Sequence, residues 1–120
     1  MNAGMVLLVL AAGAIGALAR YAVSLLFAGR QFPFAVLIVN IVGSALGGVV
    51  LGLAERAAID ADWRLVLLTG VAGGLTTFST WSVETVQLVR EGRWRTAFGS
   101  AVMNLVLGVG AAVVGYLLTS

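Results

Sequence analysis

Four long apolar runs occupy most of this chain of 120 residues and restrict the folds that it can adopt. Hydrophobic residues make up 61% of the sequence and charged residues only 10%, too few to cover the surface of a soluble domain of this size. A run of about 20 apolar residues is long enough to cross the hydrocarbon core of a bilayer as a helix. The sequence therefore predicts an all-α membrane protein.

Short polar segments separate the expected spans. We expect a single four-helix transmembrane domain over residues 1–120, with spans at about 4–28, 34–54, 65–89 and 96–118. Pro33, the only proline, precedes the second span, where its missing N–H is tolerated. Four crossings place both termini on one side of the membrane. Arginines are slightly more numerous on the other side, and this weak bias favours a cytoplasmic location for residues 90–95. A chain that inserts in both orientations would also show a weak arginine bias.

The residue types that are absent exclude several kinds of chemistry. The chain has no Cys, His or Lys, so disulfides, thiolate catalysis and imidazole-bound metals are excluded. An enzyme is not expected, because no nucleophile–base pair can form and the only plausible carboxylate within a span is Glu84. The net charge of +2 is too small and dispersed to indicate a nucleic-acid partner.

The third span contains an unusually polar stretch, "GVAGGLTTFSTWSVET" at residues 70–85. Two adjacent glycines followed by β-branched threonines are poor helix formers, so we expect a helix that is broken near its middle. Broken backbone at membrane depth is tolerated only where protein buries it or a polar cavity adjoins it. Freed carbonyls can bind a cation, and the N-terminus of a half-helix favours an anion. The alternative is hydroxyls that bond back to their own helix, with Phe78 and Trp81 packed against neighbouring helices.

Other polar residues also lie within the spans, where an unpaired polar group is costly. Arg20 either extends to the nearby interface or attracts anions into a vestibule. Asn40 either forms an interhelical hydrogen bond beside a Gly43–Gly47 contact, or offers two uncharged N–H donors to an anion. Asn104 belongs to a small-residue stripe suited to helix packing, but a second Asn at membrane depth also suggests a polar path.

The strings "GGLTTFST" (73–80), "GAIGALARY" (13–21) and "VNIVGSALGG" (39–48) resemble the Fluc family, also called CrcB, of small bacterial fluoride channels. The resemblance covers all four spans in order. It implies a dual-topology homodimer of two antiparallel subunits in the cell inner membrane, with two fluoride pores and a central structural Na⁺. By motif match, the backbone carbonyls of Gly73 and Thr76 would hold this sodium ion.

The resemblance also implies roles for individual side chains. The fluoride pore would be lined by residues of the second, third and fourth spans: Asn40, Phe78, Ser79, Thr80, Trp81 and Asn104. Arg20 and Glu84 would lie in a vestibule or beside the pore, with Glu84 hydrogen-bonded aside or protonated because an ionised carboxylate repels fluoride. Two positions depart from the family, which usually has Phe where this chain has Trp81 and commonly has Ser where we align Asn104.

The function expected on this basis is passive, fluoride-selective conduction that exports cytoplasmic fluoride and gives fluoride resistance. Two other readings stay open, namely a proton-coupled fluoride carrier that uses Glu84 and a membrane assembly subunit that transports nothing. A small multidrug antiporter would need a carboxylate in the first span, where the only charged residue is Arg20.

Overall fold

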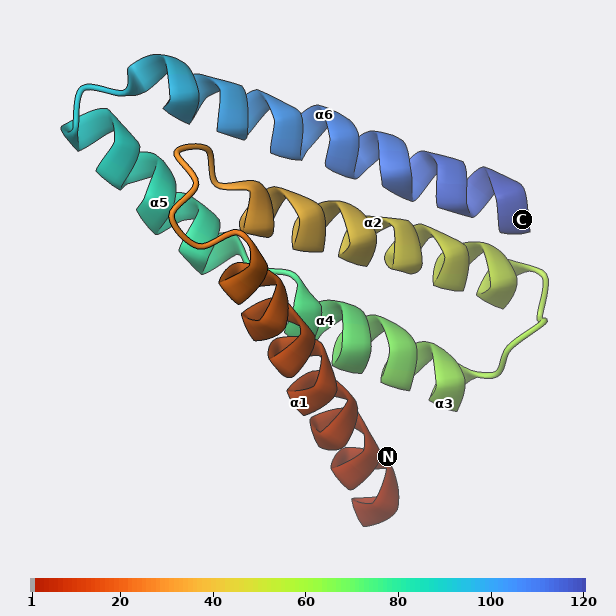
Figure 1. Ribbon diagram of the computed structural model, residues 1–120. Coiled ribbons are helices and arrows are strands. Elements are labelled where there is room, and N and C mark those ends of the chain that lie inside the picture. Colours follow the sequence, from red (N-terminus) through yellow and green to blue (C-terminus); the bar gives the residue numbers. More distant parts are fainter. Residues whose placement is uncertain (1) are drawn as a thin grey trace.

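Helices long and apolar enough to cross a membrane form the whole architecture of the chain. The computed structural model describes residues 2–120, and within them four such segments occur: Ala3–Leu26, Phe34–Glu55, Ala61–Arg90 and Trp94–Thr119. The first two are α1 (Ala3–Leu26) and α2 (Phe34–Glu55), and the last is α6 (Trp94–Thr119). The third segment consists of shorter helices: α3 (Ala61–Arg64), the π-helix η1 (Leu65–Ala72), α4 (Gly73–Leu75) and α5 (Phe78–Arg90). The predicted multi-pass membrane protein is confirmed (Figure 1).

Polar side chains and glycines define where these helices begin and end. The Asn2 side chain accepts a hydrogen bond from Met5 N at 2.8 Å and caps α1, and Asp60 caps α3 through Trp63 N at 2.9 Å. The cap at Asp60 starts the third segment at Ala61, earlier than the expected residue 65. Gly29 and Gly92 adopt φ values of 80° and 77°, which glycine permits at low cost, and they lie in the turns between α1 and α2 and between α5 and α6.

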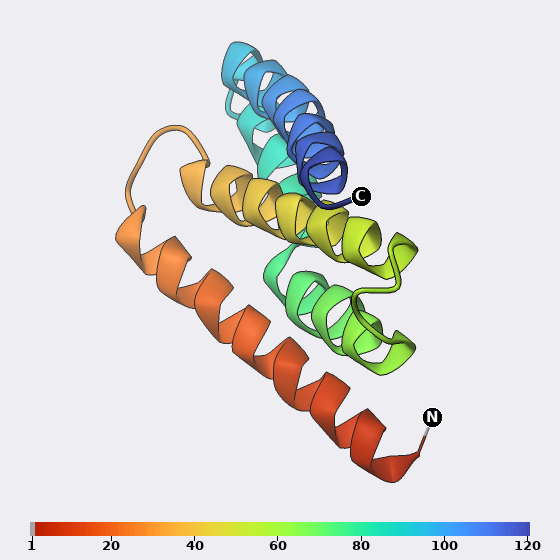
Figure 2. The same cartoon turned by 90° about the vertical axis from the view of Figure 1, so that its right-hand side faces the viewer.

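The helices pack as two principal pairs. α2 lies along α6, whereas α1 crosses obliquely against η1 and α4 (Figures 1 and 2). Because α5 turns away after the break, it reaches α6 at the end opposite the chain termini (Figure 1). The third segment therefore contacts α1 with its first half and α6 with its second half.

Glycines permit the close approach of α1 to the third segment. A Cβ at Gly74 would lie 2.9 Å from the C and Cα atoms of Gly13, and a Cβ at Gly16 would lie 2.8 Å from Leu75 N. These obstacles are backbone atoms, which cannot rotate away as a side chain would. Small residues at helix crossings are typical of membrane proteins, because packing rather than the hydrophobic effect holds the helices together there.

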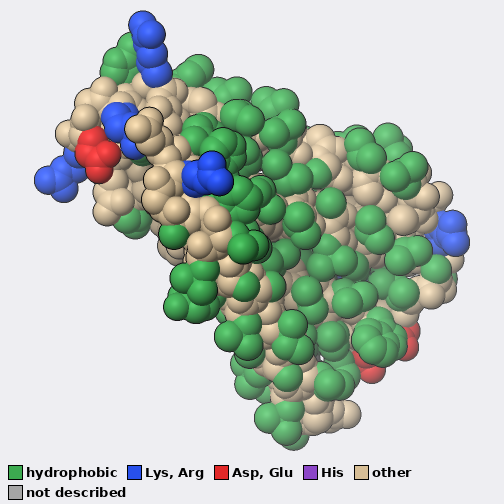
Figure 3. All heavy atoms as spheres, viewed as in Figure 1, with side chains coloured by type: hydrophobic (Ala, Val, Ile, Leu, Met, Phe, Trp, Pro, Cys, Tyr) green, Lys and Arg blue, Asp and Glu red, His purple; other side chains and the backbone are tan. Residues whose placement is uncertain are grey.

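The outer surface is largely apolar, and the charges gather at the ends of the helices (Figure 3). Large side chains such as Leu18, Leu107 and Leu117 are exposed, as expected for residues in contact with lipid. In the turn between α5 and α6, Arg93 Nη1 lies 3.9 Å from Glu91 Oε2.

Candidate functional site at the helix break

The third span is interrupted at two threonines. Thr76 has φ −78° and ψ 156°, and Thr77 has φ −148° and ψ 118°, so both residues are extended between α4 and α5. The predicted break is confirmed, but the adjacent glycines do not form it. Gly73 and Gly74 remain helical, and Gly74 instead provides the close contact with α1.

The carboxamide of Asn40 on α2 replaces the hydrogen bonds that the break removes. Its Oδ1 accepts from Thr77 N at 2.9 Å, and its Nδ2 donates to Thr77 O at 3.3 Å. The Thr77 side chain then caps α5, because its Oγ1 accepts from Thr80 N at 3.1 Å. Side chains from two spans therefore satisfy part of the backbone at membrane depth.

These contacts leave two carbonyl groups without their usual helical donors. In a continuous helix Gly73 O would accept from Thr77 N, and Thr76 O would accept from Thr80 N. Here those N–H groups are bonded to Asn40 Oδ1 and Thr77 Oγ1. Gly73 is exposed and Thr76 is half-buried. The two carbonyls that the motif match assigns to a cation are thus among those that lose their helical donors at the break.

An open groove of 340 Å³ adjoins the break. Its walls come from α2, the third segment and α6, and its lining includes Asn40, Ser44, Thr77, Phe78, Trp81 and Asn104. Phe78 is 75% exposed, and its ring meets that of Trp81 edge-on, with centroids 5.6 Å apart and an interplanar angle of 77°. The structure therefore brings four of the six predicted pore residues to one groove.

The two asparagines of this groove bond to each other. Asn40 Nδ2 donates to Asn104 Oδ1 at 3.0 Å, and Asn104 Nδ2 donates to Ser100 O at 2.8 Å. Asn104 is 7% exposed and Ser100 is fully buried. Asn40 thus makes the interhelical hydrogen bond of the first interpretation and also lines the groove, whereas its donation to an anion stays a prediction.

A second cavity, of 330 Å³, lies on the other side of Thr77. Thr77, Thr80 and Glu84 line it together from the third segment, and Arg20 lines it from α1. Arg20 Nε donates to Gly74 O at 3.4 Å, so the guanidinium extends toward the break and not only toward the interface. Among residues 2–120, two buried side-chain polar atoms lack a hydrogen-bond partner, Glu84 Oε2 and Trp81 Nε1.

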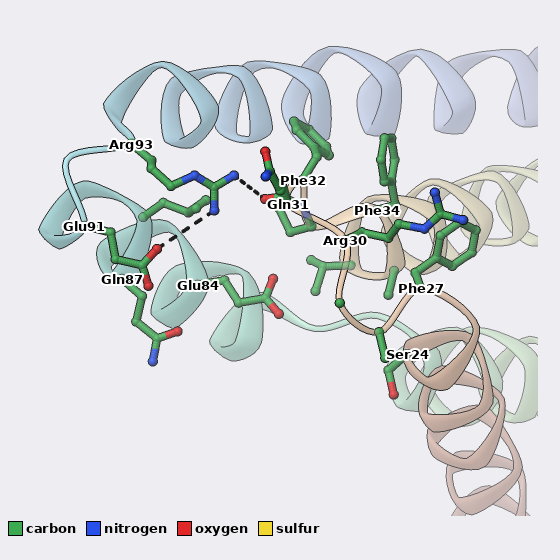
Figure 4. A pocket seen from close by; sticks show the side chains of 16 residues that line it. Ser24, Phe27, Arg30, Gln31, Phe32, Phe34, Glu84, Gln87, Glu91 and Arg93 are labelled. Atoms are coloured by element: carbon green, nitrogen blue, oxygen red, sulfur yellow. Dashed lines mark hydrogen bonds and ion pairs between the residues drawn. The ribbon is translucent and has the colours of Figure 1, made fainter.

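Glu84 also lines a third cavity, of 310 Å³, near the turns at the arginine-rich end. Figure 4 shows Glu84, Gln87 and Arg93 around this cavity, with Arg93 donating to Gln31 O and lying near Glu91. This cavity was not predicted, because its walls combine two turns with parts of α2 and α5, and no local sequence pattern encodes their relative positions.

The remaining hydroxyls of this stretch differ in their hydrogen bonds and positions. Thr76 Oγ1 donates to Ala72 O at 2.9 Å and Ser82 Oγ to Phe78 O at 2.8 Å, so these two bond back to their own helices. Ser79 is exposed, and its Oγ lies 3.3 Å from Thr77 Oγ1. Thr80 lines the second cavity, and neither Ser79 nor Thr80 belongs to the lining of the groove.

Comparison with known proteins identifies the family. The profile described as "CrcB-like protein, Camphor Resistance (CrcB)" matches residues 7–116. The chain belongs to the CrcB family. A relative from Saccharophagus degradans named "Fluoride-specific ion channel FluC" is 44% identical over 110 residues, covering 89% of this chain and 83% of the relative. A relative of the same name from Pyrococcus abyssi is 39% identical over 120 residues, covering 98% of each chain.

The three strings that resemble the CrcB family all meet at the break. The string at 73–80 contains the interruption itself. The string at 13–21 provides Gly16, which packs against it, and Arg20, which bonds to it. The string at 39–48 provides Asn40. The three strings therefore build one continuous region.

Proposed function

We propose that the chain forms a passive channel that is selective for fluoride and exports it from the cytoplasm. It belongs to the CrcB family, whose matching relatives are named fluoride-specific ion channels. It spans the membrane several times, as such a function requires. It is not an enzyme, and the bacterial inner membrane is its expected location.

The observation that carries the proposal is a groove of uncharged donors and aromatic edges beside a helix break. Fluoride holds its water tightly, so a selective pore must replace that water with compact donors without binding the ion too strongly. Asn40 provides a neutral amide, Asn104 lines the groove beside it, and Phe78 and Trp81 provide ring edges with partial positive charge. Ser79 and Thr80 would extend this path along α5 with their hydroxyls.

A second copy of the chain would complete the pore. The groove is open, and Phe78 projects from it with 75% of its surface exposed. In the antiparallel homodimer that we propose, this ring would enter the path of the other subunit, and the dimer would contain two equivalent pores. The weak arginine bias suits a chain that inserts in both orientations.

A structural sodium ion would sit where the two breaks meet. The carbonyls of Gly73 and Thr76 would hold it, and they fit this role because the amide groups that would normally bond to them are engaged by Asn40 and Thr77. Carbonyl oxygens are hard ligands suited to such a cation. When bound, the ion would supply a positive charge that offsets the anions nearby.

The charged residues of the second cavity would act at the entrance to the pore. Arg20 would attract fluoride, while its bond to Gly74 O helps to fix the break. Glu84 faces the same cavity, and it would have to be held aside or protonated while an anion passes. These roles are compatible with passive conduction and require no coupling to a proton gradient.

Fluoride efflux from liposomes containing the purified chain tests the proposal. We expect rapid fluoride efflux, negligible chloride efflux and a rate that does not follow an imposed pH gradient. A fluoride flux that tracks the gradient would instead favour a proton-coupled carrier using Glu84. A correctly folded chain that moves no anion would contradict the proposal and favour a non-transporting assembly subunit.

Trp81 should contribute to fluoride conduction through the edge of its ring, which a Phe ring can replace. We expect Trp81→Phe to retain fluoride flux and to be no less stable, because it removes a buried N–H that has no partner within residues 2–120. Trp81→Leu should reduce flux about tenfold, equivalent to about 1.4 kcal/mol, because an aliphatic side chain has no positive edge. Efflux assays on both variants measure this, and equal flux through them would contradict an aromatic role.

A further inference from the structure

The donors of Asn40 are already engaged within the chain. A primary amide has two N–H groups, and Asn40 directs them to Thr77 O at 3.3 Å and to Asn104 Oδ1 at 3.0 Å. Its acceptor oxygen is bonded to Thr77 N. An anion in the groove can therefore gain a full donor from Asn40 only by displacing one of these oxygens.

Asn104 is the partner that can be displaced at the lower structural cost. Thr77 O belongs to the backbone of the break, which Asn40 also holds through Thr77 N, so losing that contact would disturb the fold. Asn104 Oδ1 belongs to a side chain. Its own amide stays anchored to α6 through Ser100 O at 2.8 Å after the bond to Asn40 opens.

We propose that Asn104 is a positioning residue that competes with the anion for Asn40. In the empty groove its Oδ1 holds one N–H of Asn40, and an arriving fluoride takes that N–H in its place. When the ion leaves, Asn104 recovers the bond, so both donors of the half-buried Asn40 stay bonded throughout. This competition weakens fluoride binding at Asn40 and speeds release, an inference that rests on the proposed function and refines it.

Two substitutions of similar shape should shift fluoride affinity in opposite directions. Asn104→Leu removes the competing acceptor, so the fluoride concentration for half-maximal flux should fall about fivefold while maximal flux also falls. Asn104→Asp offers a stronger acceptor and repels the anion, so that concentration should rise about fivefold or more. Efflux at a series of fluoride concentrations measures both, with gel filtration to verify folding. A packing role alone would lower maximal flux and leave the half-saturating concentration unchanged in both variants, which would overturn the inference.

Magnetic resonance on the unsubstituted chain tests the same exchange without mutation. The sequence contains three asparagines, so asparagine-selective isotope labelling gives one carboxamide signal each for Asn2, Asn40 and Asn104. Added fluoride should shift the signals of Asn40 and Asn104 together, whereas chloride should shift neither and the exposed Asn2 should stay constant. A fluoride response at Asn40 alone would refute competition by Asn104. Wild-type chain without any fluoride flux would refute the proposed channel itself, whereas normal flux with unmoved half-saturation in both variants would refute only this inference.

Discussion

Asn40→Asp is expected to abolish fluoride flux. The substitution keeps the oxygen that accepts from Thr77 N but removes both N–H donors, so two oxygens, Thr77 O and Asn104 Oδ1, would face a third. It also places a negative charge in a groove that we propose conducts an anion. Loss of one hydrogen bond to the anion is worth about 1.5–3 kcal/mol, or about 10- to 160-fold, and the added charge increases this effect. We therefore expect flux to fall by about 100-fold or more.

Liposome efflux measures this effect, and Asn2→Asp is the matched control. Asn2 caps α1 through Met5 N, and Asp caps helices as well as Asn does, so the control should fold and conduct normally. Gel filtration should establish that the Asn40 variant remains folded before its flux is interpreted. A folded Asn40→Asp protein with wild-type flux would remove Asn40 from the conduction path.

Gly74→Ala is expected to produce the largest loss of stability among glycine substitutions near the break. The added methyl would lie 2.9 Å from Gly13 C and Cα and closer still to Gly13 O, so α1 would have to move outward. Overpacking against fixed atoms costs about 1–3 kcal/mol or more. Movement of α1 would also separate Arg20 from Gly74 O. We therefore expect a lower thermal midpoint and reduced flux.

Thermal unfolding in detergent tests this expectation, with Gly110→Ala as the control. A Cβ at Gly110 would meet nothing within 4 Å, and Ala is a better helix former than Gly by about 1 kcal/mol. The control should therefore be at least as stable as the wild type. Equal thermal midpoints for the two variants would show that the crossing of α1 with α4 tolerates a wider separation than its geometry indicates.

The number and approximate placement of the spans were predictable, because hydropathy alone determines which segments enter a bilayer. The existence of a break was also predictable from the composition of residues 70–85. Its position was predictable only in part. Low helix propensity marked both the glycines and the threonines of residues 73–77, but Gly73 and Gly74 are helical. Gly74 is small because α1 lies close to it. The break falls instead at Thr76 and Thr77, where Asn40 can bond to the backbone.

The sequence predicted which residues belong to the site better than it predicted their hydrogen-bond partners. Asn40, Asn104 and Arg20 were recognisable because they are polar residues within apolar spans. Burying such residues in a membrane is costly, which indicates a functional role. Their partners were not visible, because they come from helices distant in sequence. The π-helix over Leu65–Ala72 was also missed, since its residues give the same apolar pattern as an ordinary helix.

The kink in the third span is encoded in two places. Residues 76–77 supply the extended backbone, but the side chain that satisfies it belongs to a different helix. Transplanting residues 70–85 alone into another bundle would therefore give a straight helix or an unstable one. A designer who wishes to reuse this bend must carry a correctly placed asparagine with it, so the smallest portable unit is a pair of neighbouring helices.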